Sequence, residues 1–285
     1  MSIDIRDITD LAGCRAVVGV QEEVWGAESE IVPASLLVAS IKRGGILVGA
    51  YDGDRLAGFV WSLPAWRDGV NTHWSHMLGV VPDARGRRTG ERLKWAQRDR
   101  ALSQGVDLVE WTFDPLQAPN AHLNLSILGC VASTYLVDAY GSMSGPLHRG
   151  TPTDRLIAEW WIRRPHVERR RAASDPERAA PAGRLGARSS AVLEATPVLD
   201  TRPAGDWEAC GGIRTNVHTT RVLVPVPAKF GEMQQRASDL ALEWRAAARD
   251  AFQTYFARGY VAVDFFLNRE QGNGAYLLAG TQNHS

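Results

Sequence analysis

The feature that most constrains the fold is an apolar run that stops at Pro82, passes through an Arg/Gly loop and opens into a helix, over residues 80–93. Such a turn points several backbone N–H groups at one spot, and the helix dipole adds partial positive charge there. This arrangement is suited to holding a diphosphate. An ordinary strand-to-helix turn with solvated arginines fits the same residues, because Gly/Arg turns are weak motifs by themselves.

Composition narrows the class of protein. The chain has 285 residues, of which 45% are hydrophobic, which is enough for one large core or two smaller ones. Acidic and basic residues balance at 32 each, so no global charge favours nucleic acid or an anionic membrane as a partner. No apolar segment is long enough to span a membrane, and the start lacks a secretory pattern, so we expect a cytoplasmic protein. Three distant cysteines predict neither disulfides nor a metal site, and buried thiols are expected.

Strand and helix patterns alternate regularly over residues 1–162, which predicts one α/β domain. Asp10 is expected to cap the first helix, and Asp52-Gly53 to turn a hairpin. The expected strands are 3–8, 46–51, 56–61, 71–81, 106–113, 135–140 and 156–162, and the expected helices are 11–25, 33–42, 91–103 and one that starts near residue 120.

The rest of the chain divides in two. Residues 163–190 are rich in arginine and alanine and poor in large apolar groups, which predicts an exposed linker or long loop. Residues 191–285 predict a smaller α/β unit with a strand at 222–227, a long helix over 230–258, and a hairpin of 260–267 and 275–279. The helix end, glycine and strand at 101–111 recur at 255–265, which suggests a degenerate second copy of the first unit.

The element order, together with the pattern Val-x-Pro-x-x-Arg-Gly-x-x-x-Gly at residues 80–90, resembles the GNAT superfamily of acyl-CoA-dependent N-acyltransferases. Further residues resemble a subfamily of GNAT acyltransferases of unsettled substrate, well over residues 1–162 and more loosely beyond. These are Trp111-Thr112-Phe113-Asp114-Pro115-Leu116, Asn120-Ala121, Asn124, Leu128-Gly129, Tyr140-Gly141 and Gly150-Thr151-Pro152-Thr153-Asp154-Arg155. The resemblance implies a mixed, mostly antiparallel central sheet flanked by helices.

The same resemblance implies a binding site for acetyl-CoA or another acyl-CoA. Backbone groups of Leu78 and Val80 would hold the pantetheine arm, and the loop before the central helix would wrap the pyrophosphate. Arg88 stands where the family usually has glycine, so its side chain is expected to narrow the loop or to force an unfavourable backbone angle. The residues implied in acyl-CoA binding are Leu78, Val80, Arg85, Gly86, Arg87, Arg88, Thr89, Gly90 and Asn120.

Catalysis in this family needs a base for the amine and a proton for the leaving thiolate. His76 lies on the strand before the loop and suits proton transfer near neutral pH, although a strand histidine bonded to a neighbouring carbonyl is the more ordinary interpretation. Glu110 on the neighbouring strand is the second candidate base. The family's usual helix tyrosine is missing from residues 120–129, so Tyr135 or Tyr140 would replace it, unless water suffices.

Three residues are candidates for contacts with the acceptor. Arg155 would bind a carboxylate of an amino-acid-like substrate, or else would pair with Asp154 as a staple at the strand start. Trp111, with Trp66 and Trp74, would line an apolar pocket or pack in the core. Asp114 is the third, although capping the turn made with Pro115 is the simpler role.

These observations predict an N-acyltransferase that moves an acetyl or succinyl group to a small amine such as an amino acid, without metal, nucleic acid or membrane. The alternative is a catalytically decayed acyl-CoA-binding or assembly module. The C-terminal unit would cover the acceptor side of the cleft or form a homodimer contact, and the sequence pattern indicates neither.

Overall fold

The computed structural model describes residues 3–26, 30–141, 151–174, 194–268 and 272–280. They divide into two compact units. The first comprises Met1–Trp111 and Trp160–Glu168, and the second comprises Thr112–Glu159 and Arg169–Ser285. This division differs from the boundary expected at residue 162, because residues 112–159 group with the C-terminal part of the chain.

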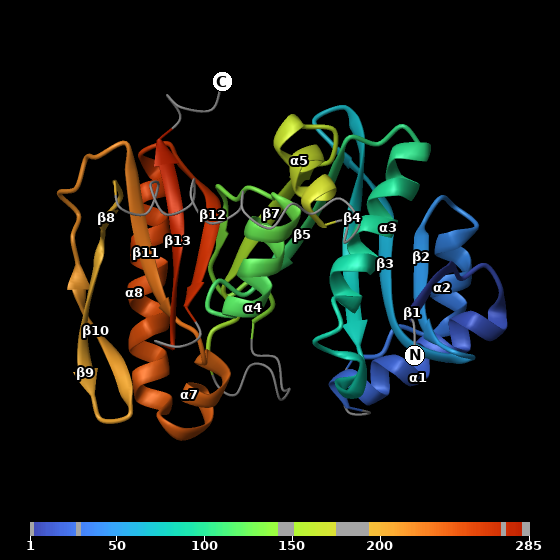
Figure 1. Ribbon diagram of the computed structural model, residues 1–285, viewed down its shortest axis with the longest axis horizontal. Coiled ribbons are helices and arrows are strands. Elements are labelled where there is room, and N and C mark those ends of the chain that lie inside the picture. Colours follow the sequence, from blue (N-terminus) through green and yellow to red (C-terminus); the bar gives the residue numbers. More distant parts are fainter. Residues whose placement is uncertain (1–2, 27–29, 142–150, 175–193, 269–271, 281–285) are drawn as a thin grey trace. The chain divides into compact units, whose positions relative to one another are not determined.

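The first unit is built on a mixed sheet in the order β1-β2-β3-β4-β5. Neighbours from β1 to β4 pair antiparallel, and β4 pairs with β5 in parallel. Figure 1 shows helices α1, α2 and α3 beside these strands, in blue to teal. The elements are β1 (Ile3–Asp7), α1 (Leu11–Trp25), α2 (Ala34–Ile41), β2 (Ile46–Asp52), β3 (Arg55–Arg67), β4 (Val70–Val80), the 3-10 turn η1 (Pro82–Ala84), α3 (Thr89–Ser103) and β5 (Leu108–Phe113).

Helices cover both faces of this sheet. On β3, Trp61 donates from its indole Nε1 to Ser40 Oγ of α2 at 2.9 Å. The next residue, Ser62, bonds to His73 of β4, whose other ring nitrogen lies 2.8 Å from Gln104 at the end of α3. Successive strand residues point to opposite faces, so α2 and α3 pack on opposite sides. The sheet is thereby the middle layer of the first unit.

The second unit holds two further sheets, one with the order β12-β13-β11-β8 and one formed by the hairpin of β9 and β10. Helix α8 packs against β10, β11 and β12 and is the long orange helix of Figure 1. Strands β6 and β7, which pair antiparallel, precede them in the chain and belong to the same sheet order as β1 to β5. The elements are α4 (Ala118–Ala121), the π-helix η2 (His122–Leu128), β6 (Tyr135–Leu136), β7 (Arg155–Trp161), α5 (Pro165–Ser174), β8 (Thr196–Pro197), β9 (Leu199–Ala204), β10 (Trp207–Ile213), β11 (Arg221–Pro227), α7 (Phe230–Arg236), α8 (Ser238–Ala257), β12 (Tyr260–Asn268) and β13 (Asn273–Gly280); α5 and β7 each extend into the first unit.

The expected α/β class and mostly antiparallel sheet are confirmed, and most elements of residues 1–113 agree with the sequence pattern to within two residues. The expected strand at 135–140 was too long. Asp138 adopts a left-handed φ of 45°, and its N–H donates to the Asp154 carboxylate, so the backbone turns after Leu136. The expected helix from 230 to 258 is two helices, which meet at Ala237 with φ −150°.

Part of the expected linker is helical. Pro165 starts α5, Val167 is fully buried, and Glu168 forms an ion pair with Arg98 of α3. Buried Val167 and the ion pair of Glu168 are two of the contacts made by a helix where the composition predicted a loop. Residues 175–193, which include the rest of that linker, lie outside the described residues.

Two further expectations concern burial and membranes. Cys14 and Cys130 are buried as expected, but Cys210 is only partly buried. Among the described residues, none of the helices combines the length and the apolar character needed to cross a membrane.

Candidate active site

Strands β4 and β5 separate soon after they pair. Their parallel ladder comprises only two residue pairs, His73 with Val109 and Trp74 with Glu110. On the other side of β4, the antiparallel register with β3 shifts at His76, which becomes an extra residue of a β-bulge. Bulges bend a strand and redirect a side chain, and they occur often beside active sites. The bulge therefore lies where β4 leaves β5.

The edge of β4 beyond the bulge carries backbone groups that β3 does not use. Val81 donates its N–H to Ala57 O at 3.0 Å. Because bonding direction alternates along an antiparallel strand, the N–H and C=O groups of Val80 and Leu78 point away from β3. In agreement, the Val80 carbonyl accepts a bond from Arg85 Nε at 3.0 Å. These are the two residues predicted to hold a pantetheine arm.

The predicted diphosphate loop leads from η1 into α3. A helical bond at this end runs from Arg92 N to Arg88 O, so the N–H groups of Thr89, Gly90 and Glu91 precede it and lie at the positive end of the helix dipole. A Cβ on Gly90 would come no closer than 3.7 Å to Leu78 Cδ2, an ordinary contact. The fold itself therefore leaves room for a side chain at Gly90.

The loop arginines have different partners. Arg87 lies 3.3 Å from Asp52, and both it and Arg85 have exposed side chains. Arg88 forms a bidentate pair with Glu91, with Nε to Oε2 at 2.8 Å and Nη2 to Oε1 at 2.6 Å. Its φ is +59°, a left-handed angle that is unfavourable for any residue with a Cβ. The backbone angle expected for a non-glycine residue at this position is thus observed.

The two histidines of β4 differ in their surroundings. His73 is buried between Ser62 and Gln104, with hydrogen bonds on both ring nitrogens. His76 is exposed on the bulge, its ring edge-on to Trp61 at 5.2 Å, and none of the hydrogen bonds in the described part of the chain uses its nitrogens. Although the residue as a whole is exposed, neighbouring atoms partly desolvate its ring, which lowers the pKa of His76 and favours a neutral imidazole at neutral pH. The histidine satisfied by neighbours is therefore His73, and His76 keeps the form that a base requires.

The other residues proposed from β5 are already engaged. Glu110 is buried and forms an ion pair with Arg67 at 2.6 Å. Trp111 is 8% exposed and packs edge-on against Trp160. The ammonium of Lys94 lies 3.4 Å from the centre of the Trp111 ring. Of the two roles considered for Trp111, core packing is the one observed.

Lys94 was not among the residues expected at the site, although it occupies the point where the strands separate. It is 2% exposed, and Nζ donates to Ser75 Oγ at 3.0 Å and to Gln97 Oε1 at 2.9 Å. A lysine on an amphipathic helix is normally solvated, so the pattern of α3 gave no signal of its burial.

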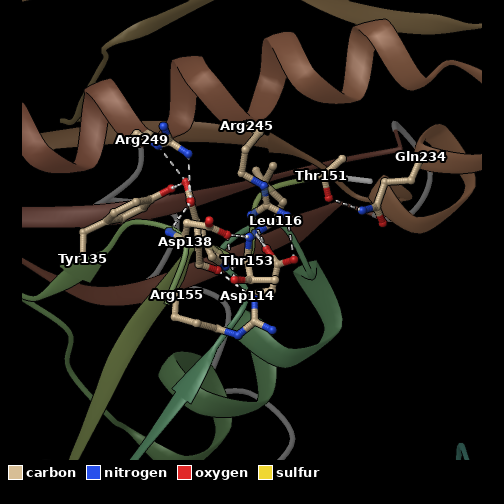
Figure 2. A network of polar contacts seen from close by, with 12 residues as sticks. Asp114, Leu116, Tyr135, Asp138, Thr151, Thr153, Arg155, Gln234, Arg245 and Arg249 are labelled. Carbon is tan, nitrogen blue, oxygen red and sulfur yellow. Dashed lines mark hydrogen bonds and ion pairs between the residues drawn. The ribbon is translucent and has the colours of Figure 1, made fainter. Parts of the chain in front are cut away.

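The remaining candidates belong to the second unit, and Figure 2 shows their polar network. Tyr135 donates its phenol proton to Asp154 at 2.7 Å, and Arg249 binds both oxygens of the same carboxylate at 2.9 Å. Burial, followed by the bond to Asp154, raises the pKa of Tyr135 far above its ordinary value. The phenol therefore stays protonated, and its proton is directed at Asp154.

Asp114 has the capping role considered for it and one that was not foreseen. It accepts the Leu116 N–H at 2.9 Å, which closes the turn at Pro115. Its two oxygens also bind Arg245 at 2.6 and 2.7 Å, and that side chain is almost fully buried. Asn120, which was implied in acyl-CoA binding, is exposed on α4. Arg245 could not be recognised from sequence, because its partner lies 131 residues away.

A mostly antiparallel sheet in which two parallel strands separate beside an Arg/Gly turn is the arrangement implied by an acyltransferase domain. Residues 15–129 match the model of the acetyltransferase (GNAT) family. These residues therefore form a GNAT acetyltransferase domain, and this part of the chain belongs to the GNAT superfamily.

Solved structures give weaker likenesses. An aminoglycoside 6'-acetyltransferase type Ii is 21% identical, with TM-score 0.46 over 58% of this chain and 100% of that one. The ribosomal-protein-S18-alanine N-acetyltransferase from Escherichia coli is 14% identical, with TM-score 0.45 over 55% and 92%. PaiA N-acetyltransferase from Thermoplasma acidophilum, in complex with coenzyme A, is 17% identical, with TM-score 0.41 over 56% and 98%. No curated protein matches by sequence. Because these scores are low, the assignment rests on the family model.

Proposed function

We propose that this chain is an acyl-CoA-dependent N-acyltransferase that transfers an acetyl or succinyl group to the amine of a small molecule, such as an amino acid or a related metabolite. The observation that carries the proposal is the separation of β4 from β5 after two residue pairs, with His76 on the bulge at that point. A thioester arm needs an unpaired strand edge, and the chemistry needs a base beside it. Both features occur within one strand of the GNAT domain.

Acyl-CoA would be bound largely by backbone groups of β4 and α3. The outward groups of Leu78 and Val80 would pair with the amides of the pantetheine arm. The first turn of α3 and the side chains of Arg85 and Arg87 would hold the diphosphate. The Val80 N–H would donate to the thioester oxygen as negative charge develops on it, and such fixed donors often supply the largest single part of catalysis.

The transfer reaction requires that one proton is removed from the amine and that one is supplied to the leaving thiolate. Neutral His76 would take the proton from the amine while the nitrogen attacks the thioester carbon. The N–C bond forms, the C–S bond breaks, and the thiolate of CoA leaves with a proton from water. Glu110 is the less favoured base because Arg67 binds it at 2.6 Å, and Tyr135 the less favoured acid because its proton is bonded to Asp154.

The test separates binding from turnover. We expect isothermal titration of the full chain to show binding of acetyl-CoA or succinyl-CoA, and an amine panel to release free thiol. The variant Gly90→Ala should weaken acyl-CoA binding, since only a ligand would meet the added methyl group. A wild-type chain that binds neither thioester would refute the proposal.

A second candidate is an acyl-CoA-binding or assembly module that has lost catalysis. Two observations favour it: the left-handed Arg88 at the loop, and the absence of tyrosine from residues 120–129. Binding of a thioester without thiol release from any amine would support this candidate. The cytoplasmic location and the homodimer contact expected from sequence stay predictions.

A further inference from the structure

A closed cluster of buried polar side chains lies between α3 and β4 in the first unit, and the proposed reaction does not use it. Its members Ser75, Lys94 and Gln97 are 6%, 2% and 0% exposed. Lys94 Nζ donates to Ser75 Oγ at 3.0 Å and to Gln97 Oε1 at 2.9 Å. Gln97 Nε2 also donates to Ser75 Oγ at 3.0 Å. The hydroxyl of one strand residue therefore accepts two bonds from α3.

Stability alone does not account for a lysine in this cluster. Removing an ammonium from water carries a large free-energy penalty, and apolar side chains of similar volume are often at least as stable in such places. The ammonium of Lys94 lies 3.4 Å from the centre of the Trp111 ring and 5.6 Å from that of Trp160, which offsets part of the penalty. The best-attested use of a retained buried polar group is to specify a register.

Ser75 lies directly beside the bulge of β4. In the ladder with β3, Ser75 pairs with Ser62, and the next pair is Met77 with Trp61. His76 is the extra residue between these two pairs. The Ser62 side chain points to the α3 side of the sheet and the Trp61 side chain to the α2 side. The His76 ring packs edge-on against Trp61, so it lies on the side opposite to Lys94.

A bulge one residue earlier would exchange the places of Ser75 and His76. His76 would then pair with Ser62 and point to the α3 side, because side chains that are paired across an antiparallel ladder share a face. Ser75 would become the extra residue, and its hydroxyl would lose its place beside Lys94. The bonds from α3 to Ser75 thus favour the register that presents His76 on the α2 side.

We propose that Lys94 is a positioning residue, which fixes the bulge of β4 at His76 by holding the Ser75 hydroxyl toward α3. The inference rests on the proposed transferase function and adds to it a residue that acts on the candidate base from the opposite face of the sheet. Lys94 touches neither thioester nor acceptor in this role, and it acts through Ser75.

The experiment compares the wild-type full chain with Lys94→Met and Ser75→Ala. Lys94→Met keeps the length of the side chain and removes the ammonium, whereas Ser75→Ala removes the acceptor and keeps the ammonium. Lys42→Met, at an exposed lysine that follows α2, is the matched control. Thermal unfolding shows whether each variant folds, and Ser75→Ala keeps the test decisive if Lys94→Met does not.

Turnover is the first readout. Lys94→Met and Ser75→Ala should each lower kcat about tenfold to hundredfold, as a misplacement of about 1 Å would, and should change the acetyl-CoA Kd less than about threefold. The double variant should lose no more than the worse single variant, because Lys94 acts through Ser75. Additive losses, an unchanged kcat in the folded variants, or a loss that Lys42→Met shares would overturn the proposal.

The second readout needs no turnover, so it separates this inference from the proposed function. The His76 ring lies 5.2 Å from Trp61, so the indole ring current should displace the imidazole proton resonances, which His76→Gln identifies in NMR spectra. Lys94→Met and Ser75→Ala should lose this displacement, and Lys42→Met should keep it. Unmoved resonances in the folded variants would refute the positioning role even if the wild type transfers acyl groups. Loss of the displacement would support it even if the wild type binds no thioester.

Discussion

Replacing Arg88 tests whether the loop before α3 stores backbone strain. A residue with a Cβ at φ +59° carries a penalty of about 1–2 kcal/mol, which glycine avoids. Glycine in turn loses about 0.5–1 kcal/mol through the greater freedom of the unfolded chain. Arg88→Gly and Arg88→Ala both remove the pair with Glu91, whose side chains are 46% and 10% exposed and whose contribution is about 0.3–0.5 kcal/mol. The comparison of Gly with Ala therefore isolates the backbone.

We expect Arg88→Gly to be more stable than Arg88→Ala by about 0.5–1 kcal/mol and to lie close to wild type. Urea unfolding followed by circular dichroism measures this as a difference in midpoint at equal slope. An alanine variant as stable as the glycine variant would refute the strained loop. Titration with acetyl-CoA then shows whether glycine also tightens binding, which would follow if the Arg88 side chain narrows the site.

His76→Ala should lower kcat by about 10²–10⁴-fold with little change in acyl-CoA affinity, and an unchanged kcat would pass the role to Glu110 or to water. Because burial lowers the pKa of His76, its imidazole stays neutral at pH values somewhat below the ordinary histidine pKa. The loss of wild-type kcat/KM on acidification should therefore occur below about pH 6.5, and this loss should be absent in His76→Ala. Gly90→Ala should keep the midpoint of unfolding and raise the dissociation constant for acetyl-CoA, and an unchanged constant would place the ligand elsewhere. Arg245→Met should destabilise the chain by about 3–5 kcal/mol, because Asp114 would be left without its partner, and the double change with Asp114→Leu should recover part of that loss in urea unfolding.

Local signals made much of the first unit predictable. Asp10 caps α1 by accepting the Gly13 N–H at 2.8 Å, and the strand and hairpin ranges follow from alternation and from the Asp-Gly turn. The repeated helix-glycine-strand segment is also present, with left-handed angles at Gly105 and Gly259. Whether it reflects a duplicated unit stays a prediction. Each of these features depends on residues that are close in the sequence.

What could not be predicted depends on long-range partners. The bulge at His76 exists only in the register of β4 against β3, and no residue type signals it. The engagement of Asp114 depends on Arg245, and that of Asp154 depends on Arg249, which lies 95 residues away in the sequence. A sequence pattern identifies which side chains carry charge, whereas the structure shows which charges are already neutralised.

The buried ammonium of Lys94 explains how the separation of β4 and β5 is accommodated. After the pair of Trp74 with Glu110, the next residues in register are Ser75 and Trp111, and they form no ladder pair. Lys94 instead contacts both, with Nζ bonded to the Ser75 hydroxyl and placed over the Trp111 ring. A cation over a tryptophan face in a desolvated site is stabilised by about 2 kcal/mol, which offsets part of the cost of burying it. Helix α3 therefore contacts both strands at the point where their ladder ends, and its first turn carries the N–H groups of the proposed diphosphate site.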